Sequence, residues 1–174
     1  MNDTKKIVII GLLVSLGLIL HFVESMVPMT AIVPGAKLGL ANIVSLIGFI
    51  LFGFSGGLLI LFFRIITGSL LAGTFMTINF YLSTTGGLLG YFAMSLTYFL
   101  LKDRFSLVGI SVIGAVFHNL GQIITAYFVI ENPGIFYYLP YLILLAIPTG
   151  IGVGLVSHYT LKYLSASFIR GVLK

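Results

Sequence analysis

Arg64 is a charged residue in the middle of a long apolar run, and it is the strongest candidate for chemistry in this sequence. If the run crosses a membrane, a charge there costs about 3 kcal/mol on insertion scales, so its presence needs a reason. A guanidinium offers forked N–H donors that match a carboxylate or a phosphate. Arg64 could therefore bind an anionic ligand. Equally, it could be a structural arginine bonded to helix carbonyls or to a buried acid.

A second polar cluster consists of His118, Asn119 and Gln122. His118 and Gln122 are four residues apart, so on a helix they share one face. Together these side chains could donate and accept hydrogen bonds with a polar ligand. The alternative is a hydrogen-bond network that only holds helices together. No second ligand at suitable spacing accompanies His118, so we expect no metal site.

Three further polar residues lie near the ends of the expected helices, namely Lys37, Asn42 and Asn79. Lys37 could attract an anion to the mouth of a pocket, and the Pro34–Gly35 pair before it could belong to a lid. With Arg64 and the second cluster at greater depth, these residues suggest a polar pocket that opens to the outside.

The elements that must position these residues are membrane-spanning helices. The chain is 59% hydrophobic and only 7% charged, whereas soluble domains carry roughly a quarter charged residues. A spanning helix needs about 20 mostly apolar residues. We therefore expect an all-α polytopic membrane protein, with residues 1–174 forming one integral membrane domain. The expected six spans are approximately residues 6–23, 38–54, 55–73, 80–101, 106–130 and 138–163, with a break at Ser55-Gly56-Gly57 and a turn at 131–134.

Positive charges predict the orientation of these spans, because cytoplasmic loops are enriched in lysine and arginine. With six spans, Lys37 alone lies on one side. The other side holds Lys5, Lys6, Lys102, Arg104, Lys162, Arg170 and Lys174. Both termini are therefore expected in the cytoplasm. Because the basic residues sit at segment ends rather than on one face, we expect no nucleic-acid partner.

Small residues recur at a spacing of four, which lets helix backbones approach closely in lipid. The pairs are Gly11 and Ser15, Gly53 and Gly57, Gly86 and Gly90, and Gly150 and Gly154. Packing within the bundle is the simpler interpretation of any one pair. A docking face for another membrane protein is the alternative.

Several activities lack their sequence requirements. The chain has no cysteine, no phosphate-binding loop of the GxxxxGK[ST] kind and no HExxH motif. Its only aspartates are Asp3 and Asp103, whereas a prenyl diphosphate synthase needs clustered aspartates to hold magnesium. We therefore expect neither an enzyme nor a cofactor.

Three stretches resemble a family of small bacterial membrane proteins called Gx transporters, also labelled heptaprenyl diphosphate synthase component I. They read P-G-A-K-L-G-L-A-N (34–42), G-A-V-F-H-N-L-G-Q (114–122) and Y-Y-L-P (137–140). The family looks like the substrate-binding S components of energy-coupling factor (ECF) transporters. That resemblance implies a multi-pass protein of the bacterial cytoplasmic membrane with six helices and an external pocket. It also implies a transmembrane partner and two ATPases. S components meet that partner through an alanine-xxx-alanine pattern, and Gly11 and Ser15 occupy a comparable place.

Two functional hypotheses follow, and a structural subunit remains a third. The first is uptake of a small micronutrient or precursor that carries an anionic group, energised by partner ATPases. The second is a non-catalytic membrane accessory of heptaprenyl diphosphate or isoprenoid-quinone synthesis or of membrane redox metabolism.

Overall fold

The computed structural model describes residues 3–26, 39–102 and 104–164, and within them every regular element is a helix. Five of these helices are long and apolar enough to cross a membrane. The expected all-α membrane architecture is therefore confirmed. In chain order the elements are α1 (Asp3–Ser25), α2 (Asn42–Leu71), α3 (Ile78–Leu101), α4 (Leu107–Ile130), the short 3-10 helix η2 (Pro133–Tyr138) and α5 (Leu139–Tyr163).

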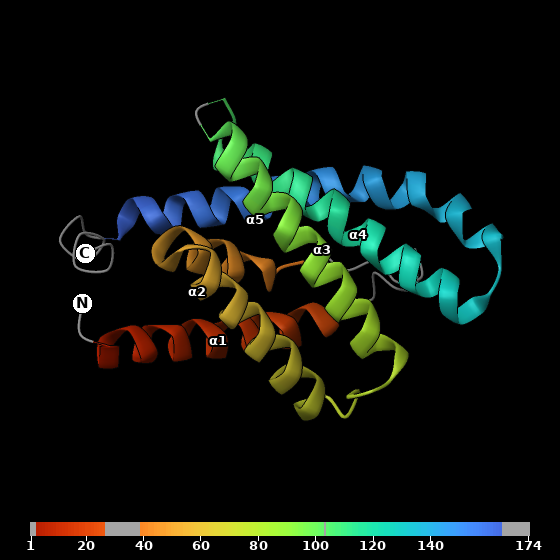
Figure 1. Ribbon diagram of the computed structural model, residues 1–174, viewed down its shortest axis with the longest axis horizontal. Helices are drawn as coiled ribbons and strands as arrows, with labels where there is room; N and C mark the ends of the chain where they lie inside the picture. The colour runs from red at the N-terminus through yellow and green to blue at the C-terminus, as the bar shows by residue number, and fades with distance from the viewer. Residues whose placement is uncertain (1–2, 27–38, 103, 165–174) are drawn as a thin grey trace.

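Helix α2 is folded back on itself at Gly53. Gly53 has φ 73° and ψ −171°, a backbone conformation that essentially only glycine adopts. The side chains of Asn42 and Arg64, 22 residues apart, meet at 3.2 Å. In a straight helix those positions would be about 33 Å apart. Helix α2 is therefore a hairpin of two arms, residues 42–52 and 54–71, as Figure 1 shows in orange and yellow.

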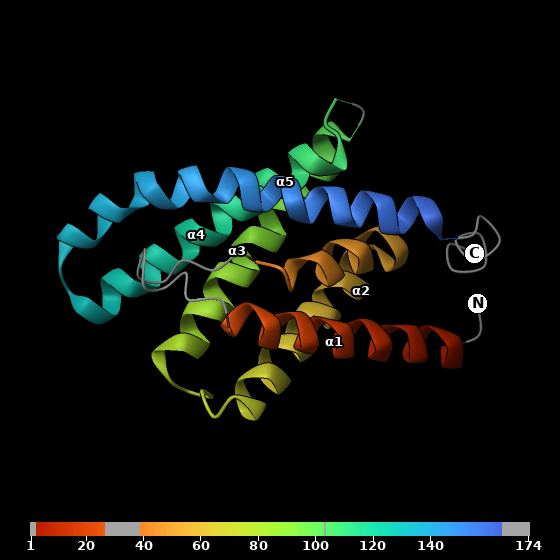
Figure 2. The same ribbon diagram turned by 180° about the vertical axis from the view of Figure 1, so that it is seen from behind.

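The number of spans differs from the sequence expectation. The structure joins the expected second and third spans in α2, and the bend precedes the expected break at Ser55-Gly56-Gly57. The first arm is about 16 Å long at the usual helical rise, while a hydrocarbon core is about 30 Å thick. Six complete spans are therefore not confirmed. The bend nevertheless reverses the chain, and the start of α1 and the end of α5 lie at the same end of the molecule (Figures 1 and 2).

The other helix boundaries follow the sequence signals closely. Helix α4 begins after Ser106, whose side chain accepts a hydrogen bond from the N–H of Gly109 at 3.2 Å. It ends at Glu131, which is left-handed with φ 53°. The side chain of Asn132 then accepts from the N–H of Gly134 at 2.8 Å, so the expected turn is confirmed.

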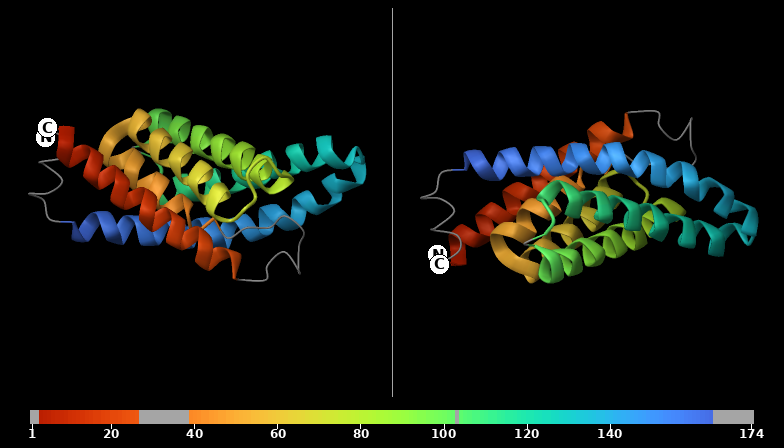
Figure 3. Two further views of the ribbon diagram at one scale, coloured as in Figure 1. Left: turned by 90° about the horizontal axis from the view of Figure 1, so that it is seen from below. Right: turned by 90° about the horizontal axis from the view of Figure 1, so that it is seen from above.

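Helices α3, α4 and α5 pack side by side through glycines (Figure 3). A Cβ added to Gly90 would lie 2.7 Å from the carbonyl oxygen of Gly114, and one on Gly154 would lie 2.5 Å from the Cα of Val108. At such distances the backbones themselves are in contact. The packing interpretation is thus confirmed for these small residues.

Helix α1 lies at the edge of the bundle and packs on α2. A Cβ on Gly17 would lie 2.8 Å from the side chain of Val44. The rest of α1 exposes large apolar side chains, as lipid contact requires; these are Ile7, Val8, Leu12, Leu16, Ile19, Phe22 and Val23.

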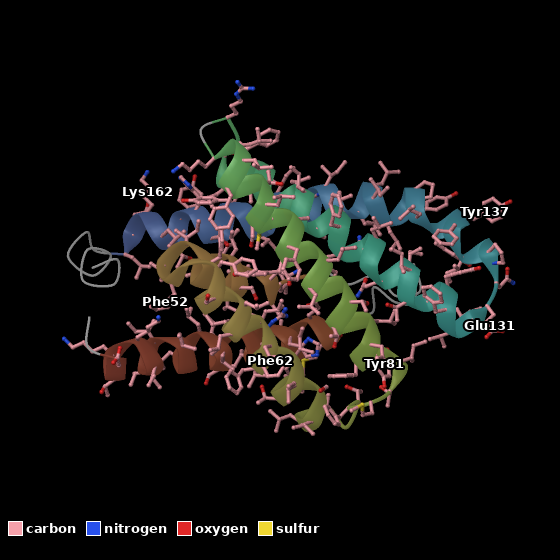
Figure 4. The ribbon with its side chains drawn as sticks, in the orientation of Figure 1. Phe52, Phe62, Tyr81, Glu131, Tyr137 and Lys162 are labelled. Carbon is pink, nitrogen blue, oxygen red and sulfur yellow. The ribbon has the colours of Figure 1, made fainter. Side chains whose placement is uncertain are left out.

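The described basic side chains at helix ends gather toward one end of the molecule, where Figure 4 shows Lys162. The start of α1, the link between α3 and α4 and the end of α5 carry them: Lys5, Lys6, Lys102, Arg104 and Lys162. Glu131 and Tyr137 lie at the opposite end (Figure 4). Lys37, Arg170 and Lys174 lie outside the described residues.

Candidate functional site

Arg64 lies in the second arm of α2 and points into the protein rather than toward lipid. Its side chain is 8% exposed, and its stem passes over Gly17 of α1, where a Cβ would lie 2.9 Å from the Arg64 Cδ. Nη2 of Arg64 donates to Oδ1 of Asn42 at 3.2 Å. Its Nε is buried and has no hydrogen-bond partner among the described residues. The guanidinium thus keeps a donor for a further acceptor.

Glu24 is the residue that the sequence interpretation missed as a partner of Arg64. It lies at the end of α1 and is 8% exposed. Its Oε1 accepts a hydrogen bond from the N–H of Gly39 at 2.5 Å. Its carboxylate also interacts electrostatically with Arg64. The buried acid weighed as an alternative partner is therefore present, and Arg64 is not an isolated charge.

A small cavity lies at the centre of the bundle. Both arms of α2 and helices α3, α4 and α5 contribute to its wall; its polar or ring-bearing lining residues are Asn42, Ser45, Tyr91, Ser111 and His118. Its volume is about 20 Å³, and about 10–15 Å³ on this scale holds one water. Sites for small molecules are commonly about 300–1,000 Å³. A ligand could therefore enter only if the surrounding helices or side chains moved apart.

His118 and Gln122 lie on the face of α4 that meets α3. Both are buried, at 7% and 2% exposure. A Cβ on Gly86 of α3 would lie 2.8 Å from Cγ of Gln122 and 3.2 Å from Cε1 of His118. The shared face expected from their spacing is thus confirmed. Oε1 and Nε2 of Gln122 have no hydrogen-bond partner in the described part of the chain.

Asn119 forms a hydrogen bond between two helices. Its Nδ2 donates to the carbonyl oxygen of Leu142 at 2.8 Å, with both groups buried. This bond ties α4 to α5, as the network alternative predicted. Asn119 therefore has less to offer a ligand than Gln122.

Among the described residues expected at the site, Asn42 and His118 line the cavity, whereas Arg64, Asn79, Asn119 and Gln122 do not. Asn79 is exposed in the first turn of α3, and Lys37 lies outside the described residues. The described ranges contain no group of three or more His, Cys, Asp or Glu side chains that could hold a metal.

Gly11 and Ser15 are the small-residue pair of which neither member is covered by another described helix. Both are exposed on α1. A Cβ on Gly11 would meet no atom within 4 Å, and Ser15 donates to the carbonyl oxygen of Gly11 at 3.0 Å. This surface is available to lipid or to another protein.

Comparison with known proteins gives one match. The model of the family described as heptaprenyl diphosphate synthase component I matches residues 13–160. No curated protein and no solved structure matches the chain. The match runs from α1 into the last turn of α5, and it includes every candidate site residue except Gly11. The chain therefore belongs to the heptaprenyl diphosphate synthase component I family.

Proposed function

We propose that this protein is a substrate-binding membrane subunit, similar to an ECF S component, for uptake of a small micronutrient or precursor. The observation that supports this proposal best is the buried guanidinium of Arg64. Charged groups inside a membrane are costly and usually serve a pathway or a ligand. Arg64 is held by Asn42, keeps a buried donor without a partner in the described chain, and is connected through Asn42 to the central cavity, which Asn42 lines.

In this proposal, both termini are cytoplasmic and the substrate enters from the opposite side of the bacterial cytoplasmic membrane. Lys37 attracts the anionic group of the substrate, and Arg64 and Asn42 bind it. His118 and Gln122 orient the rest of the molecule. Because the cavity is small, binding must widen the space between α2 and the α3–α4 pair. No bond is made or broken, so the protein is not an enzyme.

Energy for release would come from partner ATPases through a transmembrane subunit. The exposed surface around Gly11 and Ser15 is our candidate for that contact, because no other described helix packs against it. Gly11→Leu tests this assignment. It should leave the melting temperature unchanged and prevent co-purification with a membrane partner. Equal co-purification by Gly11→Leu and the wild type would exclude this face.

The second candidate is a non-catalytic membrane accessory of heptaprenyl diphosphate or isoprenoid-quinone synthesis or of membrane redox metabolism. The family description favours it. It requires a partner that supplies the catalytic aspartates, since this chain has only Asp3 and Asp103. It also requires a prenyl chain, rather than a small polar solute, as the bound molecule.

Native mass spectrometry in mild detergent separates the two candidates. The wild type is compared with Arg64→Ala, and Asn79→Ala serves as a control because Asn79 is exposed away from the cavity. Arg64→Ala leaves Glu24 without its counter-charge. The double variant Arg64→Ala/Glu24→Gln therefore checks that loss of binding is not loss of folding.

A small polar molecule bound to the wild type and to Asn79→Ala, but absent from both Arg64 variants, is the expected result. A bound prenyl or quinone species would favour the accessory function. A folded wild-type protein that holds nothing would contradict a binding role for Arg64.

A further inference from the structure

The side-chain amide of Gln122 is buried within the bundle and makes no hydrogen bond to a described residue. Gln122 is 2% exposed, and both Oε1 and Nε2 lack a partner. A buried amide without partners destabilises a protein, so such groups are normally paired with protein, water or ligand. The hydrogen-bond partner of this amide could therefore be the substrate itself.

The position of Gln122 connects it to the candidate site. Gln122 itself does not line the central cavity, but His118, one helical turn earlier on the same face, does. Gly86 faces both side chains without a Cβ of its own. The neighbouring Asn119 already ties α4 to α5 through Leu142. Gln122 faces α3 instead and takes no part in that bond.

A carboxamide presents one acceptor and one donor side by side, and it does so in either orientation of the group. The group that fits it best is a ligand in which an N–H lies next to an acceptor, because glutamine can then form two hydrogen bonds. Glutamine pairs with adenine in this way. A prenyl chain or a simple carboxylate offers no such edge. The amide therefore favours ligands in which an N–H lies next to a hydrogen-bond acceptor.

We propose that Gln122 determines specificity by pairing its amide with an adjacent N–H and C=O of the substrate, as found in cyclic amides and nucleobase-like rings. This inference rests on the proposed function, in which Arg64 binds the anionic end of the same molecule. It adds that the other end is a planar, hydrogen-bonding heterocycle.

Gln122→Met tests the inference because it keeps the length of the side chain and removes both hydrogen-bonding groups. If the amide serves a ligand, the melting temperature of the ligand-free variant should equal or exceed that of the ligand-free wild type, because an unpaired buried amide is gone. If the amide instead stabilises the folded protein, for example by a hydrogen bond to a buried water, the melting temperature of Gln122→Met should fall. Ser157→Ala is the matched control, since Ser157 is also fully buried without a described partner but lies on α5 rather than on the face of α4 that carries His118.

Binding is measured on the same variants by native mass spectrometry. A species held by the wild type and by Ser157→Ala, but at least tenfold depleted on Gln122→Met and Arg64→Ala, is expected, since two neutral hydrogen bonds are lost. Its fragmentation should reveal an adjacent N–H and C=O. If Gln122→Met retains a species that Arg64→Ala loses, or the species lacks that edge, the inference is wrong while the proposed function stands.

Added uracil gives a second test of the inference that does not depend on a co-purified species. Its analogue 1,3-dimethyluracil has the same ring without the N–H donors. Uracil should raise the melting temperature of the wild type more than the analogue does, and should not raise that of Gln122→Met. Equal shifts, or none, would overturn the assignment of Gln122.

Discussion

The contact of α5 with α4 at Gly154 gives the sharpest stability prediction, because a matched control lies two residues away. A Cβ on Gly154 would lie 2.5 Å from the Cα of Val108 and 3.1 Å from the Cβ of Ser111. A Cβ on Gly152 of the same helix would meet no atom within 4 Å. Gly154→Ala and Gly152→Ala therefore make the same chemical change in opposite surroundings.

The magnitude follows from these distances. Carbon atoms in contact prefer about 3.5–4.0 Å, so Gly154→Ala must push α5 away from α4 by roughly 1 Å. Overpacking of this kind costs about 1–3 kcal/mol. Both variants gain about 1 kcal/mol of helix propensity from alanine. The propensity cancels in the comparison, so Gly154→Ala should be about 1–3 kcal/mol less stable than Gly152→Ala.

Thermal unfolding of the two variants in the same detergent measures this difference. For a chain of this size, 1 kcal/mol corresponds to about 2–4 °C in melting temperature. Gly154→Ala should therefore melt about 2–12 °C below Gly152→Ala. Equal melting temperatures, or a more stable Gly154→Ala, would show that α4 and α5 do not meet through this glycine.

Three further predictions concern α2, the α4–α5 link and the buried charges. Gly53→Ala should lower stability by about 1–3 kcal/mol, because its backbone conformation strains any residue with a Cβ; an unchanged melting temperature would mean that the bend does not depend on glycine. Asn119→Ala should cost about 1 kcal/mol by removing the bond to Leu142, with retention of any bound small molecule in native mass spectra; loss of that molecule would return Asn119 to the binding site. Glu24→Gln keeps an acceptor for the N–H of Gly39 but removes the counter-charge of Arg64, so it should cost up to about 3–5 kcal/mol. The double variant Arg64→Ala/Glu24→Gln should recover part of that loss in thermal unfolding, and no recovery would show that the two charges are not coupled.

The sequence predicted the helices well where a boundary has a chemical marker. Pro133 and Gly134 mark the expected turn at 131–134, and the structure places that turn between α4 and α5. The break in α2 was placed at the wrong glycines. Gly57 serves packing, since a Cβ there would lie 2.9 Å from the backbone of Phe49, whereas Gly53 makes the bend. Close helix packing and a sharp backbone bend both require glycine, so the residue type alone does not show which glycine makes the bend.

The candidate site was predicted in part for a similar reason. Burial of Arg64, His118 and Gln122 could be anticipated, because ionisable and polar groups in a spanning helix turn away from lipid. The pairing of Arg64 with Glu24 depends on how α1 crosses α2, which the spacing of residues within one helix does not encode. Asn119 was included with its neighbours, but its face of α4 meets α5.

The hairpin of α2 has a consequence for how this protein enters the bilayer during synthesis. The arm from Asn42 to Phe52 is too short to be recognised as a complete span, and the polar Asn42 at its start makes separate insertion still less favourable. Arg64 in the second arm meets that same Asn42. The two arms should therefore leave the translocation channel together, after the ribosome has made the chain through Leu71, so that the arginine and the asparagine enter the lipid already paired.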